Sequence, residues 1–565
     1  MIQELVEYGK RVSKGKSLAF NEEAFAIDLV INQNGEFLRF IVGDEKYIDA
    51  EAITAKKGKA RLLLDKSQEV LGVGKDAGNK HALFLEKLRK YESVPSLKPV
   101  FLFYQNEQAL KNAQKEFEIL GKKFKTKDEN ITFMVGTTRL LETNEIRKAI
   151  ECQFQEEEQR LRDGRICSIC GTDKSPILDE PHGMVKMPNG HSAGSALVSF
   201  NETAFESYGL KGNLNSSICR SCARYYVRGL KNLLQGHEVP AEDGKKSIFR
   251  YDHRINISDT TVVLFWTRED TDEVNPFIVS DIPDASDIKR MFGSIWNGNK
   301  DIADTVETNM FYSLTVSSAV ARIAVRDWTA ISLDEYKKNL ADWFRDIEIE
   351  NYKGETVYST LRQLVNASQR DRRPGDRQKS DLAARARIGA ILWNASVKGA
   401  SYKIPLEILE YTLNRIWKGD IFTPERASLI KLIINRNTDN NMKSTLDESN
   451  MSVAYLCGRL FAVIESMQWK AMGNVNSSIK DRFFTAAASQ PAYVFGTLLT
   501  KNVPIYQHKI GGYLAKELKE LAGRISEQGT LPSRFSTIEQ GEFALGYYFQ
   551  VTNRSNKESD GNINQ

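Results

Sequence analysis

The chain has little net charge for its length. Its 565 residues include 78 Lys and Arg against 74 Asp and Glu, a formal net charge of +4. This near balance excludes a uniformly basic surface, so nucleic-acid binding would have to use local patches. The sequence also lacks an apolar run of membrane-spanning length, and its start, Met1 to Leu5, lacks a basic segment followed by an apolar one. We therefore expect a cytoplasmic protein with no membrane partner.

Recognisable catalytic motifs are missing as well. There is no Gly-x-Ser-x-Gly, no His-Glu-x-x-His, no His-x-Glu followed by Pro-Cys-x-x-Cys, and no His-Asp pair typical of metal-dependent nucleases. The six histidines are scattered along the chain: His81, His182, His191, His237, His253 and His508. We therefore expect a binding protein and not an enzyme, with an unfamiliar active site as the alternative.

Cysteine is scarce, but four of the six cysteines form two Cys-x-x-Cys pairs. The pairs are Cys167 with Cys170 and Cys219 with Cys222, separated by residues 171–218. Two such pairs can complete a closed four-thiolate site, so the spacing predicts one structural zinc ion. The alternative is two redox or packing pairs that never meet. His182 and His191 could supplement or replace a zinc ligand.

The segment between the cysteine pairs is rich in glycine, asparagine and serine, with Phe200, Phe205 and Tyr208 interleaved. Such a composition is typical of an irregular surface that offers backbone N–H groups and small polar side chains to phosphates or base edges. An ordinary loop-rich insertion is the alternative. The candidate nucleic-acid contacts in it are Lys186, Asn189, Ser199, Asn201, Lys211, Asn213 and Asn215.

Basic residues elsewhere add further candidates. A predicted helix from Ser217 to Leu234 places Arg220, Arg224, Arg228 and Lys231 in one stripe. The other candidates are a basic turn with Lys56, Lys57 and Lys59, the pair Arg322 and Arg326, and a loop with Arg372 and Arg373. Basic residues between Lys470 and Arg524 are interspersed with Phe483, Phe484, Tyr493 and Tyr506, a pattern that suits base stacking. Solvated faces, ion pairs and core aromatics are the alternatives.

The elements predict an α+β fold: a mixed N-terminal and central α/β region with a zinc-stapled insertion, followed by a C-terminal helical bundle. Residues 1–165 form an N-terminal α+β region, with strands Phe25–Val30 and Phe37–Val42 around an Asn34-Gly35 turn. The cysteine-bracketed insertion covers 166–250, and a strand-rich segment, 251–331, returns to the N-terminal domain. Helices fill 332–550, beginning with caps such as Ser332 and Thr423. Residues 551–565 are predicted to be a disordered tail.

Four stretches carry a resemblance to a known family. The most specific runs from Gly194 through Val198-Ser199-Phe200-Asn201 to Ser207-Tyr208-Gly209. The others are Leu62-Leu63-Leu64-Asp65, Thr261 to Trp266, and Ala321 to Trp328. From about residue 1 to 550, the chain resembles the large subunit of the type I-C CRISPR Cascade complex. The zinc prediction rests on the cysteine spacing and not on this resemblance.

The resemblance implies a DNA-binding and RNA-binding role in bacterial antiviral defence. The subunit would recognise the protospacer-adjacent motif on double-stranded target DNA, help to open the duplex and hold the displaced single strand. Its partners would be CRISPR RNA, the Cascade backbone, handle-capping and small subunits, and a helicase-nuclease recruited after R-loop formation. The family also implies a small subunit made from an internal start, for which Met442 and then Met451 are the candidates. The alternative function is a zinc-containing nucleic-acid-processing enzyme.

Overall fold

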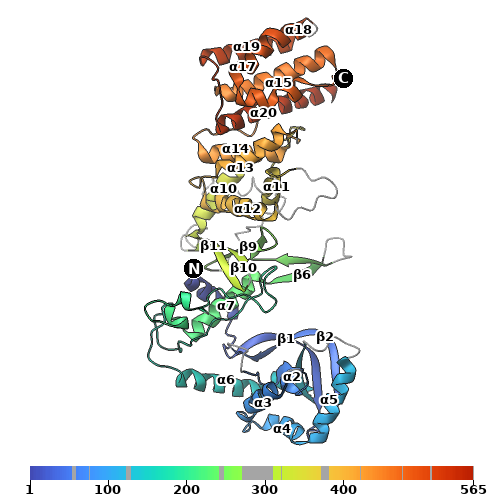
Figure 1. Ribbon diagram of the computed structural model, residues 1–565, viewed down its shortest axis with the longest axis vertical. Coiled ribbons are helices and arrows are strands. Elements are labelled where there is room, and N and C mark those ends of the chain that lie inside the picture. The colour runs from blue at the N-terminus through green and yellow to red at the C-terminus, as the bar shows by residue number, and fades with distance from the viewer. Residues whose placement is uncertain are drawn as a thin grey trace. The chain divides into compact units, whose positions relative to one another are not determined.

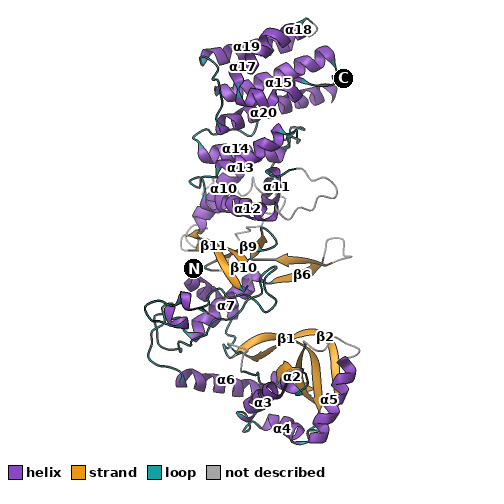
Figure 2. Cartoon of the chain, viewed as in Figure 1, coloured by secondary structure: helices purple, strands orange, loops and turns teal. Residues whose placement is uncertain are grey.

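The computed structural model describes residues 1–53, 59–74, 77–121, 129–200, 202–240, 247–269, 309–319, 321–370, 381–419, 421–473, 475–508 and 512–563. The chain divides into two compact units, Met1–Gln235 with Ser318–Ala324, and Gly236–Ser317 with Val325–Gln565. Both are mixed helix and strand, which confirms the predicted α+β class (Figure 2). Within the described residues, no helix is both apolar enough and long enough to cross a membrane.

The first unit is built on a twisted sheet with the order β2-β1-β4-β3 and β5 paired to β4. Its strands are β1 (Phe20–Ile31), β2 (Phe37–Glu51), β3 (Leu64–Lys66), β4 (Asn130–Val135) and β5 (Thr138–Arg139). Helices α2 (Ser67–Val70), α3 (Ala77–Arg89), α4 (Lys98–Gln105), α5 (Glu107–Gly121) and α6 (Asn144–Arg160) complete this part (Figure 1). One apolar core joins the sheet to these helices, with Phe84, Phe103 and Phe133 at its centre.

The predicted N-terminal hairpin is present. Strands β1 and β2 pair antiparallel, from Phe20 opposite Glu51 to Ile31 opposite Phe37. Gly35 in the turn has φ 76°, and a Cβ atom there would lie 2.4 Å from the backbone nitrogen of Phe103. Glycine is therefore required both by the left-handed backbone and by the close approach of α4.

Two helices far apart in the sequence pack closely in the first unit. Helix α1 (Ile2–Ser13) lies against α7 (Arg220–Leu234), which confirms the helix predicted at 217–234. A Cβ atom at Gly9 would lie 1.9 Å from the carbonyl oxygen of Tyr225, and one at Gly229 would lie 2.8 Å from that of Leu5. The two glycines therefore let the backbones approach, and this contact fixes the helix that carries the second cysteine pair.

The second unit joins a sheet to helices in one core. Strands β8 (Arg254–Asn256), β9 (Thr261–Thr267), β10 (Met310–Ala319) and β11 (Arg322–Ser332) form a sheet in the order β11-β10-β9-β8. A short hairpin of β6 (Gly236–Pro240) and β7 (Ser247–Tyr251) precedes it. Phe265 and Phe311 of this sheet share a core with Tyr336 and Trp393 from the helices.

The predicted return of 251–331 to the N-terminal domain is therefore wrong. These strands do not pair with the N-terminal sheet, and only the segment Ser318–Ala324 belongs to the first unit. The physical reason is that the apolar face of β9 and β10 is covered by helices that follow it in the chain. Strand character alone did not reveal which sheet the strands would join.

Helices make up the rest of the second unit. They are α10 (Leu333–Ile347), α11 (Leu361–Ala367), α12 (Asp381–Lys398), α13 (Leu406–Trp417), α14 (Pro424–Asn437), α15 (Val453–Met472), α16 (Ile479–Ser489), α17 (Pro491–Thr497), α18 (Val503–Gln507), α19 (Gly512–Glu527) and α20 (Thr537–Ile563), with a small ladder of β12 (Ile349–Glu350) and β13 (Thr356–Val357). The side chains of Ser332 and Thr423 cap α10 and α14 as predicted.

The predicted disordered tail from 551 differs from the structure, because α20 continues to Ile563. Its earlier part is anchored by buried Phe543, Tyr547 and Tyr548. No proline interrupts the polar sequence that follows, and extending an existing helix costs far less than starting one.

Candidate metal centre and the loop that it anchors

The first cysteine pair lies in a tight turn. The backbone N–H of Gly171 donates to the carbonyl of Cys167 (2.9 Å), and Cys167 donates its own N–H to the carbonyl of Thr172 (3.0 Å). Gly171 has φ 68°, so this turn uses a left-handed residue directly after Cys170. The backbone N–H of Ile169 points to the sulfur of Cys167 (3.4 Å). Such N–H donors stabilise a negatively charged sulfur.

The second pair lies at the start of α7. Cys219 is the N-cap of this helix, and its sulfur accepts from the backbone N–H of Cys222, in the first turn. The backbone N–H of Cys219 in turn points to the sulfur of Cys167 (3.3 Å). The N-terminus of a helix carries partial positive charge, which favours thiolates at these positions.

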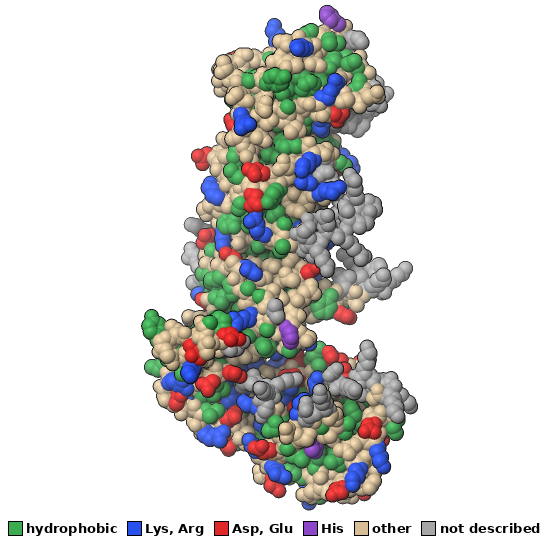
Figure 3. Space-filling view, in the orientation of Figure 1, with side chains coloured by type: hydrophobic (Ala, Val, Ile, Leu, Met, Phe, Trp, Pro, Cys, Tyr) green, Lys and Arg blue, Asp and Glu red, His purple; other side chains and the backbone are tan. Residues whose placement is uncertain are grey.

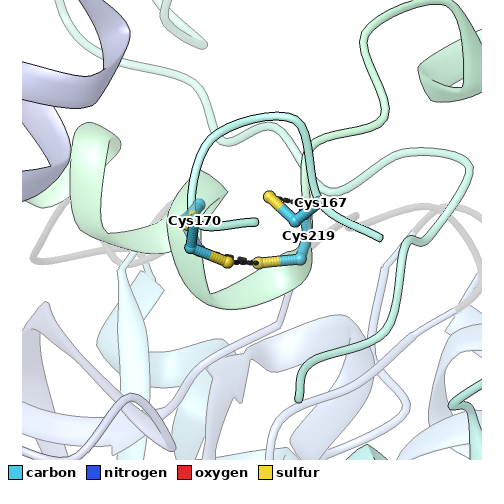
Figure 4. A group of neighbouring side chains, drawn as sticks. Cys167, Cys170 and Cys219 are labelled. Carbon is cyan, nitrogen blue, oxygen red and sulfur yellow. Dashed lines mark hydrogen bonds between the residues drawn. The ribbon is translucent and has the colours of Figure 1, made fainter. Parts of the chain in front are cut away.

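The four sulfur atoms converge. All lie within 4.8 Å of one another, and none forms a disulfide. The sulfurs of Cys170 and Cys219 are 3.9 Å apart, and Figure 4 shows these two residues beside Cys167. Four thiolates around one tetrahedral zinc, with Zn–S bonds of about 2.3 Å, stand about 3.8 Å from each other. The cluster could therefore hold a metal ion after a small contraction. The prediction that the two pairs meet is confirmed, and the alternative of separate pairs is wrong.

The protonation states of the thiols differ. Donation by the Cys222 thiol lowers the pKa of Cys219 to about 5, whereas the pKa of Cys222 is raised because it donates and is buried. Burial also raises the pKa of Cys167. A bound cation would have to displace the protons that these two thiols retain, so the affinity for metal should rise with pH.

Asn213 occupies the interior of the insertion and not its surface. Its side chain is fully buried, and its amide NH₂ group donates to the carbonyls of Leu178 and Ile218, both at 2.8 Å. Its Oδ1 is 2.7 Å from the donating hydroxyl of Ser216 and 3.0 Å from His182 Nε2. The prediction that Asn213 contacts nucleic acid is therefore wrong. Buried amides of this kind fix loop geometry.

The tautomer of His182 follows from these contacts. Asn213 Oδ1 can only accept, so His182 Nε2 carries the proton and Nδ1 accepts from the hydroxyl of Tyr226 at 2.8 Å. Burial lowers the pKa of His182 to about 4, which keeps the ring neutral. Because both ring nitrogens are engaged and the cysteine cluster is complete without it, His182 is a structural residue and not a metal ligand. His191 lies exposed in its loop, where its Nδ1 accepts from the N–H of Ala193.

Asn215 also organises the loop from within. Its Oδ1 accepts from the N–H of Ser207, and its amide NH₂ group donates to the carbonyls of Leu210 and Gly212, all at 3.0 Å. These three bonds give the side chain a structural role, and its predicted role in base reading stays a prediction.

The predicted basic stripe of α7 also has structural partners. Arg224 donates to the carbonyls of Leu18 and Ala52, and Arg228 donates to those of Lys16, Ser17 and Phe20. Arg220 is 4 % exposed, pairs with Glu157 at 2.9 Å and stacks on Phe154. The three arginines contact the segment after α1, the hairpin and α6, so each has a structural role. Their role as nucleic-acid ligands stays a prediction. A sequence pattern gives the face of a helix but not the carbonyls opposite it.

The other candidates lie at different places. Lys59, Lys186, Asn189 and Lys211 are exposed, and Ser199 is half-buried. Arg322 stacks on Phe205 at 4.2 Å, whereas Arg326 donates to Ser317 at 2.7 Å. Of the C-terminal aromatics, Phe484 and Tyr506 are buried and Tyr493 is exposed. Lys56, Lys57, Asn201, Arg372 and Arg373 lie outside the described residues. On the face that Figure 3 presents, basic and acidic side chains are interspersed, in keeping with the small net charge.

The residues that the sequence did not point to are the partners of the first turn of α7. Glu157 and Glu158 of α6 flank Arg220, and Ser175 donates to Glu158 (3.3 Å) while it accepts from the N–H of Ser221 (3.1 Å). The consecutive glutamates on α6 were a weak sequence signal for this contact. A buried arginine needs an acidic partner, because an unpaired buried charge is costly.

Comparison with known proteins identifies the family. A search of curated proteins gives no match. The family model described as CRISPR-associated protein (Cas_Csd1) matches residues 5–554, which is nearly the whole chain. The protein therefore belongs to the Cas_Csd1 family of CRISPR-associated proteins.

Proposed function

We propose that this chain is the large subunit of a type I-C Cascade complex, an RNA-guided DNA surveillance complex. The family match over residues 5–554 carries this proposal, because a CRISPR-associated family implies CRISPR RNA and other Cas subunits as partners. In this role the chain recognises the protospacer-adjacent motif, helps to open the duplex and holds the displaced strand. A separate helicase-nuclease, recruited afterwards, performs the cutting, so the chain itself acts by binding and not as an enzyme.

The exposed polar residues of the insertion support motif recognition. Lys59, Lys186, Asn189 and Lys211 are exposed on loops of the first unit. Lysines of this kind contact phosphates and fix the register, whereas an amide side chain can read a base edge. Asn213 is withdrawn from this role for the structural reasons given above.

We propose that Cys167, Cys170, Cys219 and Cys222 hold one zinc ion. A closed four-thiolate site leaves no open coordination position, so the ion supplies structural cross-linking and no chemistry on a substrate. It joins the turn at 167–172 to the start of α7, and thereby closes the loop between them.

The test compares two substrates in the assembled complex. The double variant Lys186→Ala/Asn189→Ala should bind a fully paired duplex with the motif about tenfold more weakly, as expected for lost base and phosphate contacts. A target opened beforehand should be bound within about twofold of wild type, because guide pairing then supplies the affinity. Lys115→Ala, at an exposed lysine of α5, is the matched control.

Three results would count against the proposal. Equal weakening on both substrates would mean that these residues do not act in motif recognition. Cleavage of DNA by the isolated chain with a divalent metal would instead favour a nucleic-acid-processing enzyme. Binding to partner subunits without any DNA affinity at low salt would favour a purely assembling protein.

A further inference from the structure

The insertion contains a tight turn at Ser207–Leu210. The N–H of Leu210 donates to the carbonyl of Ser207 at 2.9 Å, and the two residues form an isolated antiparallel bridge. Tyr208 has φ 53° and Gly209 has φ 74°. Positive φ at both central residues is the signature of a type I′ turn. The side chain of Tyr208 is 100 % exposed, so its ring stands at the tip of this turn.

A tyrosine at this position is costly for the fold. Central positions of a type I′ turn favour asparagine, aspartate and glycine, and a bulky residue with positive φ is strained. A tyrosine ring normally contributes to stability through burial, but the fully exposed ring of Tyr208 makes no such contribution. Neither the turn nor the core explains the residue, and such an outlier points to a role outside folding.

The turn is held firmly in spite of its exposure. Asn215 donates to the carbonyls of Leu210 and Gly212 and accepts from the N–H of Ser207, so it brackets Tyr208 on both sides. The next two residues, Ser216 and Ser217, accept with their carbonyls from the hydroxyl (2.6 Å) and the N–H (2.9 Å) of Ser168. Ser168 lies between Cys167 and Cys170. The tip is therefore connected through two short steps to the cysteine cluster.

The surroundings of the tip combine aromatic rings and cations. Phe205, 38 % exposed, carries the guanidinium of Arg322 over its ring at 4.2 Å, and Lys211 is exposed directly after the turn. Glu202 and Glu206 are exposed in the same loop, so the loop is not suited to follow a phosphate backbone along its whole length. A projecting ring with a few nearby cations is instead typical of sites that stack bases.

We propose that the Tyr208 ring is a stacking site for an unpaired nucleobase, held in position by Asn215 and the cysteine cluster. The inference rests on the proposed function and names one part of it, the contact made to a base where the duplex begins to open. An aromatic ring inserted at such a step stabilises the unstacked base without reading its identity.

The experiment uses the assembled complex and two short duplexes that carry the motif but no complementarity to the guide. One is fully paired, and the other has a two-nucleotide bubble next to the motif with 2-aminopurine in it. Wild type should bind the bubble about tenfold more tightly and quench the 2-aminopurine fluorescence, as expected for one stacked base. Tyr208→Ala should lose both the preference and the quenching, while its motif-dependent binding to the paired duplex stays unchanged.

Three further variants sharpen the test. Tyr208→Phe keeps the ring and should behave like wild type. Asn215→Ala keeps the ring but removes the hydrogen bonds that hold the turn. Its preference for the bubble should therefore lie between that of wild type and that of Tyr208→Ala. Tyr47→Ala removes another exposed tyrosine, 63 % exposed on β2 and outside the insertion, and should change nothing.

The outcomes separate this inference from the proposed function. A Tyr208→Ala complex that still prefers and quenches the bubble overturns the stacking site, as does a wild-type complex without any preference. In both cases motif-dependent binding of the paired duplex would leave the proposed function standing. A wild-type complex that binds neither duplex in a motif-dependent manner would contradict the proposed function, and this inference would fall with it.

Discussion

The sulfur of Cys219 accepts a hydrogen bond from the backbone N–H of Cys222, so one cysteine is both the cap of α7 and a candidate metal ligand. The first turn of the helix thereby orients the sulfur of Cys219. The first pair depends instead on a tight turn with Gly171 at φ 68°. The geometry of the site is thus set by one helix start and one turn, and α7 is fixed by α1 through Gly9 and Gly229.

Removal of one cluster cysteine should remove the metal. We expect the purified chain to contain about one zinc per molecule, as a four-thiolate site binds one ion, and Cys222→Ser to contain almost none. Atomic absorption of the dialysed protein measures this. Cys152→Ser, at an exposed cysteine outside the cluster, is the control and should keep the full content. A metal content unchanged in Cys222→Ser would contradict the assignment.

Loss of Arg224 should affect stability and not DNA binding. Its guanidinium donates to the carbonyls of Leu18 and Ala52, and hydrogen bonds from charged groups contribute about 1.5–3 kcal/mol each. Arg224→Ala should therefore lower the free energy of unfolding by about 3–6 kcal/mol in denaturant titrations. Refolded complexes should keep the salt dependence of DNA affinity. A flatter salt dependence at unchanged stability would support Arg224 as a phosphate contact.

The close contact of α15 with α20 should not tolerate a methyl group. A Cβ atom at Gly458 would lie 1.9 Å from the carbonyl oxygen of Phe543, and one at Gly546 would lie 2.1 Å from that of Tyr455. We expect Gly458→Ala to lower the free energy of unfolding by about 3 kcal/mol, since packed backbones cannot move apart without cost. The control is Gly523→Ala in α19, where nothing lies within 4 Å, and where alanine should add about 0.5–1 kcal/mol.

Acid should destabilise the insertion through His182. Burial lowers the pKa of this ring to about 4 in the folded chain, against an ordinary value of 6.5. As the pH falls, His182 therefore binds a proton in the unfolded chain at a higher pH than in the folded chain. The stabilisation is complete above pH 6.5 and is lost progressively down to pH 4, by at most about 3 kcal/mol.

Hydrogen exchange of the insertion between these pH values measures the effect of His182. His182→Gln can still donate to Asn213, and it should show a weaker pH dependence than wild type. His191→Gln, at an exposed histidine, should follow wild type. Identical slopes for all three proteins would refute the assigned cause.

A fragment that starts at Met442 stays a prediction. It would contain α15 to α20, among which α15 packs on α19 and α20. It would lack α13 and α14, whose residues Leu409, Ile430 and Ile434 cover α20 near Gly541. We expect mass spectrometry of the purified complex to show a C-terminal chain of about 14 kDa, in proportion to 64.0 kDa for 565 residues. A complex with the full-length chain alone would contradict this.

Several local features were predictable because they depend on neighbouring residues in the sequence. The two cysteine pairs, the Asn34-Gly35 hairpin and the caps at Ser332 and Thr423 are each encoded within a few positions. The Tyr208-Gly209 turn is not in this class, because tyrosine is disfavoured at a central position of a type I′ turn. Local hydrogen bonds and backbone preferences act over one turn of chain, so a short motif contains the information.

The sequence by itself determined that four cysteines could share one ion and that helices would follow strands. Only the tertiary structure decided that Asn213 and Arg224 face inward and that the strands of 254–332 join the helical unit. The physical reason is that the hydrogen bonds of an amide or a guanidinium can be satisfied either by water at the surface or by backbone carbonyls in the interior. The choice depends on which distant backbone groups lack a partner, and these groups meet only when the chain has folded.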